Sequence, residues 1–325
     1  MRSDFWVSGC GAIKTLANKP RNIIGRFSSD LRRRSRRLLS DCVPDRFVHA
    51  DRFKRIFGRP LDLKHPQTFN EKLFWLMLYY RRPVLTRVAD KYEVRSYIAE
   101  RVGPEILNEL YGVWDRVADI DFASLPEAFV LKVTWGSGMN INCPDKSKLN
   151  LRWAKEQLAL WTSRNFYWEA REWCYKNIKP RIICERFLID SIWGTPPDYK
   201  FFCFGGEPRF VQVDTDRFTR HSRDLFDLDW RPLPFNIMYP SSGRKIPRPS
   251  NFDEMVAYAR RLSNGLPFVR VDFYSIDGRS MFGEMTWYPE GGGARFEPGS
   301  YDYYWGEQLQ LPPRRRYWRS LGCNS

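Results

Sequence analysis

The sequence predicts an α+β protein, in which helices come first and antiparallel hairpins dominate the second half. A capping box formed by Thr68 and Glu71 precedes an apolar run, which predicts a helix that ends at about Tyr80. Two hairpins are indicated further on, because β-favouring residues flank Gly205-Gly206-Glu207 and, later, the turn signal Asp277-Gly278. Helices combined with antiparallel pairs are typical of this class.

Shorter patterns predict the remaining elements. Helices are expected over residues 89–99, 151–164 and 253–262. Strands are expected over residues 130–133, 182–188, 199–204 and 209–213, and along the two runs beside Asp277-Gly278. The sequence shows no internal repeat.

The 325-residue chain has room for two or three subdomains. Its formal net charge of +15 comes from its ends: residues 1–60 hold 15 Lys and Arg against 5 Asp and Glu, and the tail from residue 312 holds four Arg and no acid. The predicted regions are a basic, flexible extension (1–60), a helical N-terminal region (61–128), a subdomain with a glycine loop (129–193), a subdomain with an acid-bearing hairpin (194–311) and a basic tail (312–325).

The basic clusters at residues 31–39 and 313–319 have three interpretations. They are solvated arms, they attach to anionic lipid headgroups, or they bind nucleic acid. Near an anionic membrane each basic residue contributes roughly 1 kcal/mol. Nucleic acid is the least favoured, because neither cluster adjoins a recognition motif.

Other classes of protein are disfavoured by composition. No stretch approaches the roughly 18 apolar residues of a membrane span, and the start of the chain lacks the pattern of a secretion signal. Seven scattered Cys without a C-x-x-C pair argue against a disulfide framework and a zinc ribbon. We therefore expect a cytoplasmic protein, with a place at the inner face of the membrane as an option for its basic ends. With three His in the chain, oxygen ligands for Mg²⁺ are a better expectation than a histidine metal site.

A candidate metal site lies on the last predicted hairpin. Arg270 and Asp272 share one strand, and Glu284 and Thr286 share the next. A three-residue loop over 277–279 would place Asp272 opposite Glu284, with Thr286 on the same face because side chains alternate along a strand. Two carboxylates would then converge where Mg²⁺ could hold a phosphate, and Arg270 could stabilise charge on a transferring phosphoryl group.

A candidate nucleotide site lies upstream. Lys132 ends a strand just before the turn Gly136-Ser137-Gly138, whose backbone amides could approach a phosphate. The strand that follows continues into Glu185, Phe187 and Leu188, which could form a hinge that reads adenine. The remaining candidates are Lys200 for the α-phosphate and Asp198 or Asp190 for the ribose. Taken alone, each signal is more typical of an ordinary turn or of strand packing than of a nucleotide site.

Taken in order, these features resemble the ATP-grasp ligases, and in particular the TupA-like ATP-grasp family of teichuronopeptide and capsular polysaccharide synthesis. The resemblance covers about residues 61–311. It is carried by motifs at residues 68–72, 90–92, 129–132, 136–140, 175–181, 198–204, 213–218, 227–230 and 268–272.

The resemblance implies an ATP-grasp fold, in which two α+β subdomains clamp ATP. It implies that ATP phosphorylates a carboxylate and that an amine attacks the acylphosphate to give an amide. Lys132 and Lys200 then look like the phosphate-side and adenine-side lysines, residues 136–138 like the loop that closes over the β- and γ-phosphates, and Asp272 and Glu284 like the Mg²⁺ ligands. Thr286 departs from the pattern, because many such enzymes have Asn there.

Three functional hypotheses follow. The first is an ATP- and Mg²⁺-dependent carboxylate-amine ligase acting on a cell-surface polysaccharide or its precursor, with saccharide- or amino-acid-linked substrates. The second is a glycosyltransferase or sugar-phosphate transferase, suggested by the D-x-D motif Asp214-Thr-Asp216. The third is a non-enzymatic tether that binds membrane or nucleic acid through the basic ends. Residues whose role stays open between substrate contact and structure are Trp135, Arg181, Arg217, His221 and Gly291-Gly-Gly293.

Overall fold

The computed structural model describes residues 43–215 and 221–314. The basic cluster at 31–39, most of the cluster at 313–319, and the candidate residues Asp216 and Arg217 lie outside the described residues. Within the described ranges, none of the helices has both the length and the apolar character to cross a bilayer.

The helical N-terminal part starts earlier than expected. It contains α2 (Asp45–Phe57), α3 (Phe69–Tyr79), α4 (Pro83–Ala89) and α5 (Val94–Val102). We expected order to begin near the capping box, and this is wrong: α2 precedes it and buries Phe53 completely. The capping box itself is confirmed, since Thr68 accepts a hydrogen bond from the Glu71 amide and Glu71 accepts one from the Thr68 amide.

The predicted helix over residues 89–99 is wrong at its start. Asp90 ends α4, and its carboxylate accepts hydrogen bonds from the amides of Tyr92 and Glu93. An Asp side chain that bonds nearby amides competes with helical hydrogen bonding, so a turn separates α4 from α5.

The first sheet has four antiparallel strands in the order β1-β4-β2-β3. They are β1 (Leu110–Trp114), β2 (Phe129–Val133), β3 (Asn140–Cys143) and β4 (Ile182–Arg186). Helix α6 (Leu151–Thr162) packs against β2 with Ala154 and Leu158 buried, and the short α7 (Tyr167–Ala170) follows. The predicted helix and strands of this part are therefore present.

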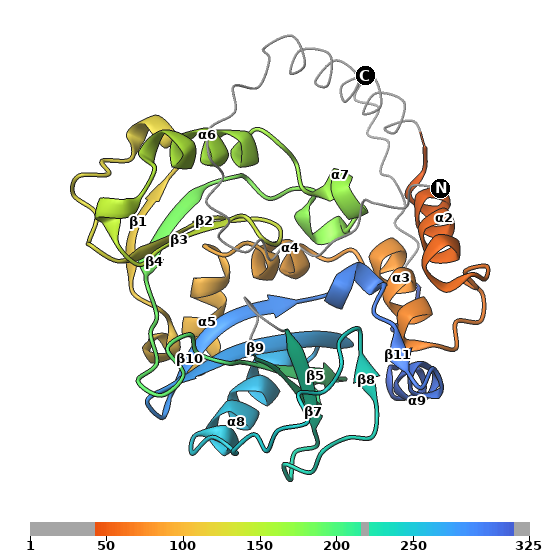
Figure 1. Cartoon of the computed structure of the whole chain (residues 1–325). Helices are drawn as coiled ribbons and strands as arrows, with labels where there is room; N and C mark the ends of the chain where they lie inside the picture. Colours follow the sequence, from red (N-terminus) through yellow and green to blue (C-terminus); the bar gives the residue numbers. More distant parts are fainter. Residues whose placement is uncertain (1–42, 216–220, 315–325) are drawn as a thin grey trace, which may run out of the picture.

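The second sheet has five antiparallel strands in the order β10-β9-β5-β6-β7. They are β5 (Asp198–Phe204), β6 (Glu207–Thr215), β7 (Ser222–Phe226), β9 (Phe268–Ile276) and β10 (Arg279–Thr286). Helix α8 (Phe252–Ser263) covers one face, as Figure 1 shows, and contacts β5, β6 and β9. The register places Lys200 between Gln212 and Asp272, which gathers polar side chains in the middle of the sheet.

Helix α9 (Ser300–Gln308) joins the end of the described chain to its beginning. It packs on α3, where Asp302 accepts hydrogen bonds from the backbone and side-chain amides of Asn70. The small pair β8 (Asn236–Ile237) and β11 (Phe296–Glu297) lies beside it. In Figure 1 the four-stranded sheet lies above and the five-stranded sheet below, with α4 between them.

Candidate functional site

Three predicted metal ligands converge on one nitrogen atom. Nη2 of Arg270 donates to Asp272 Oδ2 at 2.6 Å, to Glu284 Oε1 at 3.0 Å and to Thr286 Oγ1 at 3.1 Å. A second bond from Arg270 Nε to Asp272 Oδ1 at 2.7 Å makes that pair bidentate. The hairpin therefore brings together all four residues that the sequence singled out, around a cation.

The turn of this hairpin differs from the expected one, although Asp272 and Glu284 pair as predicted. The turn has two residues, Asp277 and Gly278, both with positive φ, and Ile276 pairs with Arg279. Such turns match the twist of hairpin strands. An irregularity between Phe282 and Glu284 then shifts the register by one residue, so that Asp272 still pairs with Glu284. The three-residue loop was wrong, but the β-bulge at Gly283 restores the predicted pairing.

The two carboxylates have different electrostatic surroundings. Burial raises the pKa of Asp272 to about 6, against the opposing effect of Arg270 and Lys200. Burial also disfavours ionised Glu284, but Arg270, Lys91 and Lys200 together outweigh it and lower its pKa to about 2. The Glu284 side chain is 46% exposed, whereas that of Asp272 is 4% exposed, so Glu284 is the more accessible member of the pair.

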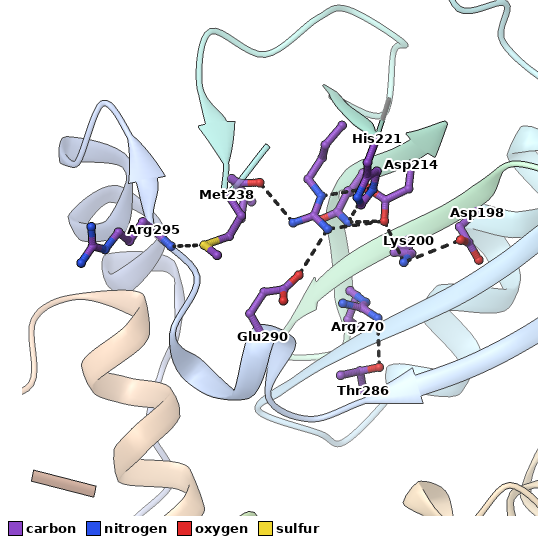
Figure 2. A network of polar contacts seen from close by, with 12 residues as sticks. Asp198, Lys200, Asp214, His221, Met238, Arg270, Thr286, Glu290 and Arg295 are labelled. Atoms are coloured by element: carbon purple, nitrogen blue, oxygen red, sulfur yellow. Dashed lines mark hydrogen bonds and ion pairs between the residues drawn. The ribbon is translucent and has the colours of Figure 1, made fainter. Parts of the chain in front are cut away.

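Lys200 lies in a buried ring of acids. Its Nζ is 2.9 Å from Asp214, 3.8 Å from Asp198 and 4.0 Å from Asp272. Figure 2 shows these side chains from β5 and β6 directed toward one another, with Arg270 and Thr286 nearby. The structure thus places Lys200 next to the metal hairpin, rather than apart from it.

Asp214 is fully engaged by neighbouring donors. It is 1% exposed, and besides Lys200 it accepts hydrogen bonds from Arg223 at 2.8 Å and from Gln212 at 3.1 Å. These positive charges hold its pKa well below the usual range in spite of burial. Asp214 is thus engaged by three donors, and Asp216, the other acid of the D-x-D motif, lies outside the described residues.

Lys132 lies on the other sheet. Its Nζ donates to Glu185 Oε2 at 2.7 Å, and Arg95 donates to Glu185 Oε1 at 3.0 Å. The Glu185 side chain thus holds two cations, and the adenine-reading hinge expected of the main chain over residues 185–188 stays a prediction. Phe187 and Leu188 follow the end of β4 and are half-buried.

The glycine loop connects β2 to β3. Gly136 and Gly138 both have left-handed φ values, of 72° and 70°, which glycine adopts without strain. Ser137 and Gly138 are exposed, so their amides are accessible to a ligand. Trp135 is 3% exposed and belongs to the core, which favours its structural role.

Lys91 connects the two halves of the site, and the sequence reasoning gave it no role. Its Nζ donates to the Gly136 carbonyl at 2.5 Å, and its amide donates to the Thr134 carbonyl. Burial lowers its pKa, and the nearby charges that act on it are those of Glu284 on one sheet and of Lys132 on the other. The sequence signal for Lys91 is the motif at residues 90–92, which supports the family resemblance but does not by itself assign a role to Lys91.

The other candidates have structural partners. Asp190 accepts hydrogen bonds from the amides of Ile192 and Trp193 and so shapes its own loop. Arg181 pairs with Asp90 at 3.1 Å and with Glu93.

His221 lies 3.4 Å from Asp214, where Figure 2 shows it above the ring of acids. The glycine run is closely packed: a Cβ at Gly292 would lie 3.0 Å from Met77, and one at Gly293 would lie 2.9 Å from Ile56. The run is therefore part of the packed body.

Comparison with known protein families assigns the chain to a family. The pattern described as TupA-like ATP-grasp matches residues 71–310. The chain belongs to the TupA-like ATP-grasp family. The predictions of the family and of an α+β, ATP-grasp fold are confirmed. No curated protein sequence matches it.

Solved structures resemble the chain distantly. The ATP-grasp ligase PsnB with a minimal precursor is 11% identical over 66% of this chain and 59% of that chain, with a TM-score of 0.36. D-alanine–D-alanine ligase from Bacillus anthracis with ATP is 12% identical over 62% and 55%, with a TM-score of 0.35. N5-carboxyaminoimidazole synthetase from Staphylococcus aureus with ADP is 10% identical over 62% and 44%, with a TM-score of 0.37. The chain thus spans less than two thirds of these proteins, and such distant similarity carries no information on substrates.

The donor set at the hairpin suits a magnesium ion that is shared with a nucleotide. The oxygens of Asp272, Glu284 and Thr286 lie within 3.1 Å of one point, the Arg270 nitrogen. In the described ranges, no group of three or more His, Cys, Asp or Glu side chains could hold a metal by itself. Mg²⁺ is usually held by one or two carboxylates together with substrate phosphates and waters, so this incomplete set fits it.

Proposed function

We propose that the protein is an ATP- and Mg²⁺-dependent carboxylate-amine ligase that forms an amide through an acylphosphate. The observation that most supports the proposal is the position of Lys91: its ammonium donates to the carbonyl of Gly136 in the glycine loop at 2.5 Å, and its charge interacts with those of Glu284 on one sheet and Lys132 on the other. A ligase of this kind requires both sets of groups around a single polyphosphate chain.

The chain's own residues supply positioning and charge. Lys132 and Lys91 bind phosphate oxygens near the glycine loop, and the amides of Ser137 and Gly138 cover them. Lys200 binds from the opposite sheet. Asp272 and Glu284, with Thr286, hold Mg²⁺, which supplies charge neutralisation on the phosphates.

Arg270 supplies the positive charge at the hairpin. Without a metal it neutralises Asp272 and Glu284. Arg270 would stabilise charge on the oxygens of the transferring phosphoryl group, where electrostatic stabilisation is the main contribution to catalysis. Because phosphoryl transfer needs no protein nucleophile, the few histidines of the chain are no obstacle.

The substrates that we propose are a carboxylate of a cell-surface saccharide, such as a uronic acid, and an amine such as an amino acid. This rests on the family, which is linked to teichuronopeptide and capsule synthesis. We place the reaction in the cytoplasm, where ATP is available, with the basic ends of the chain against the anionic inner face of the membrane.

The test is the formation of ADP, phosphate and a trapped acyl group. The protein is incubated with ATP, Mg²⁺ and pools of uronate saccharides, with hydroxylamine added to convert an acylphosphate into a hydroxamate. We expect ADP release and hydroxamate that depend on the acid pool, and both lost in Lys132→Met but retained in Lys72→Met. Lys72 is the control lysine, because its ammonium donates to the backbone carbonyls of Gly306 and Leu309, away from the site. Absence of ADP with every acid and amine pool would refute the proposal.

The transferase alternative is less well supported, because Asp214 is engaged by Lys200, Arg223 and Gln212. The tether alternative concerns basic clusters that lie almost entirely outside the described residues. Sedimentation with anionic vesicles, with and without residues 1–42, distinguishes a membrane role of the ends from the reaction itself.

A further inference from the structure

A second recess lies apart from the ATP site, beside α9. Its volume is about 610 Å³, within the range of about 300–1,000 Å³ of small-molecule sites. Aromatic rings of Phe235, Tyr301, Tyr304 and Trp305 line it, and Arg209 lies at its edge. None of these residues takes part in the proposed reaction.

The aromatic rings form a layered wall. Phe235 stacks on Tyr301 with ring centroids 4.4 Å apart, and Trp305 meets Tyr304 edge-to-face at 5.0 Å. Phe235 and Trp305 are buried, whereas Tyr304 is 50% exposed, so its ring is available to a ligand. An exposed aromatic face beside polar groups is suited to the flat, C–H-bearing face of a sugar ring.

The polar groups around this wall lack partners. Among the described residues, Arg209 has neither a hydrogen bond nor an ion pair, and the hydroxyls of Tyr301 and Tyr304 have no hydrogen bond. The indole N–H of Trp305 is buried and also without a partner. Arg209 and Tyr304 are exposed, so their polar groups are available to hydrogen-bond an oxygen-rich ligand.

The guanidinium of Arg209 favours a negatively charged ligand. Arg209 can bind a carboxylate through two parallel N–H bonds, a geometry that Lys does not offer. The other charged residue of the pocket, Asp227, already accepts hydrogen bonds from the amides of Asp229 and Arg231. Arg209 is exposed, so its guanidinium is accessible to a ligand.

We propose that this pocket binds an acidic sugar unit, with the ring on Tyr304 and the carboxylate on Arg209. Arg209 and Asp214 are five residues apart on β6, a distance of roughly 17 Å along the strand. The sugar held here is therefore separate from the reacting carboxylate. If the ligase reaction stands as proposed above, the pocket recognises a second unit of an acidic saccharide chain.

The experiment is calorimetric titration of the full chain with a short oligogalacturonate, without ATP, beside a neutral maltooligosaccharide of equal length. We expect the acidic chain to bind and the neutral one to bind at least about tenfold more weakly, because it lacks the bidentate pair with Arg209. Tyr304→Ala and Arg209→Gln should each weaken acidic binding about tenfold or more.

Tyr303→Ala is the matched control. Tyr303 is the neighbouring tyrosine on α9, is 51% exposed and does not line the pocket, so its replacement should leave binding unchanged. The proposal is overturned if the acidic chain does not bind, if the neutral chain binds equally well, or if Tyr303→Ala weakens binding as much as Tyr304→Ala. ATP affinity, measured on the same variants, should not change. For the wild type, ATP binding without binding of the acidic oligosaccharide overturns the pocket alone, and binding of the acidic oligosaccharide without ATP binding overturns the ligase alone.

Discussion

His49 and Glu172 should give the protein two opposed pH dependences that single substitutions separate. His49 on α2 is fully buried, and neither ring nitrogen forms a hydrogen bond within the described residues. Burial lowers its pKa from 6.5 to about 4, helped by Arg52 and Arg81 and opposed by Asp45. Burial raises the pKa of Glu172 from 4.5 to about 7, opposed by Arg52.

The signs follow from which state binds more protons. Between pH 4 and 6.5 the unfolded chain protonates His49 and the folded chain does not, so this group makes stability rise with pH. Between pH 4.5 and 7 the folded chain keeps the proton of Glu172 and the unfolded chain loses it, so this group makes stability fall with pH. Each difference in pKa corresponds to about 3 kcal/mol, since one pKa unit equals about 1.4 kcal/mol.

Urea unfolding of the wild type, His49→Leu and Glu172→Gln at several pH values tests this reasoning. Other titrations cancel when each variant is compared with the wild type. His49→Leu should gain about 3 kcal/mol relative to the wild type as the pH falls from 6.5 to 4. Glu172→Gln should gain a similar amount as the pH rises from 4.5 to 7. Variant curves parallel to that of the wild type over these ranges would show that neither group is perturbed by burial.

Three further predictions concern packing and the loop geometry. Gly136→Ala should lower the free energy of unfolding more than Gly58→Ala does in urea melts. Both glycines have φ near 72°, so each substitution costs about 1–2 kcal/mol in backbone strain. Only at Gly136 would the new Cβ also meet a side chain, that of Phe166, at 2.7 Å. Equal losses would contradict it. Gly283→Ala should weaken Mg²⁺-ATP binding in titration calorimetry, because its Cβ would lie 3.0 Å from the Asp272 carbonyl, whereas Gly299→Ala has open space and should not. Phe210→Ala should cost about 3–5 kcal/mol in thermal or urea unfolding, because Phe210 is fully buried and stacks on Phe202 at 4.3 Å, and Phe47→Ala at the surface should cost less than about 0.5 kcal/mol.

The elements with strong local signals were predictable. The capping box at Thr68, the helix near Leu151 and both long hairpins rest on short-range rules of capping, periodicity and turn chemistry. Strands β1 and β7 and helix α9 were not predicted. Their stability comes from distant partners: β1 pairs with β4, and α9 packs on α3.

The candidate site was predictable residue by residue, but its geometry was not. Asp272, Glu284 and Thr286 were correctly placed together, although the bulge at Gly283 that aligns them leaves no local signal beyond a glycine in a strand. Lys91 was missed because its partners lie far from it in sequence. It donates a hydrogen bond to Gly136 and interacts with the charge of Glu284. Asp214 was misread because its partner Arg223 lies on the next strand, and only the sheet register brings the two together.

Calorimetric titration with ATP, with and without Mg²⁺, is the most direct test of the site. The wild type should bind ATP more tightly with Mg²⁺, and Glu284→Gln should lose this enhancement because it removes a metal ligand. Asp302→Asn is the matched control, because Asp302 is a buried carboxylate on α9 that accepts hydrogen bonds from Asn70 on α3 and none from the hairpin residues, and this variant should keep the enhancement if it folds. Mg²⁺-dependent binding that survives in Glu284→Gln, or no ATP binding by the wild type, would contradict the proposed ATP site.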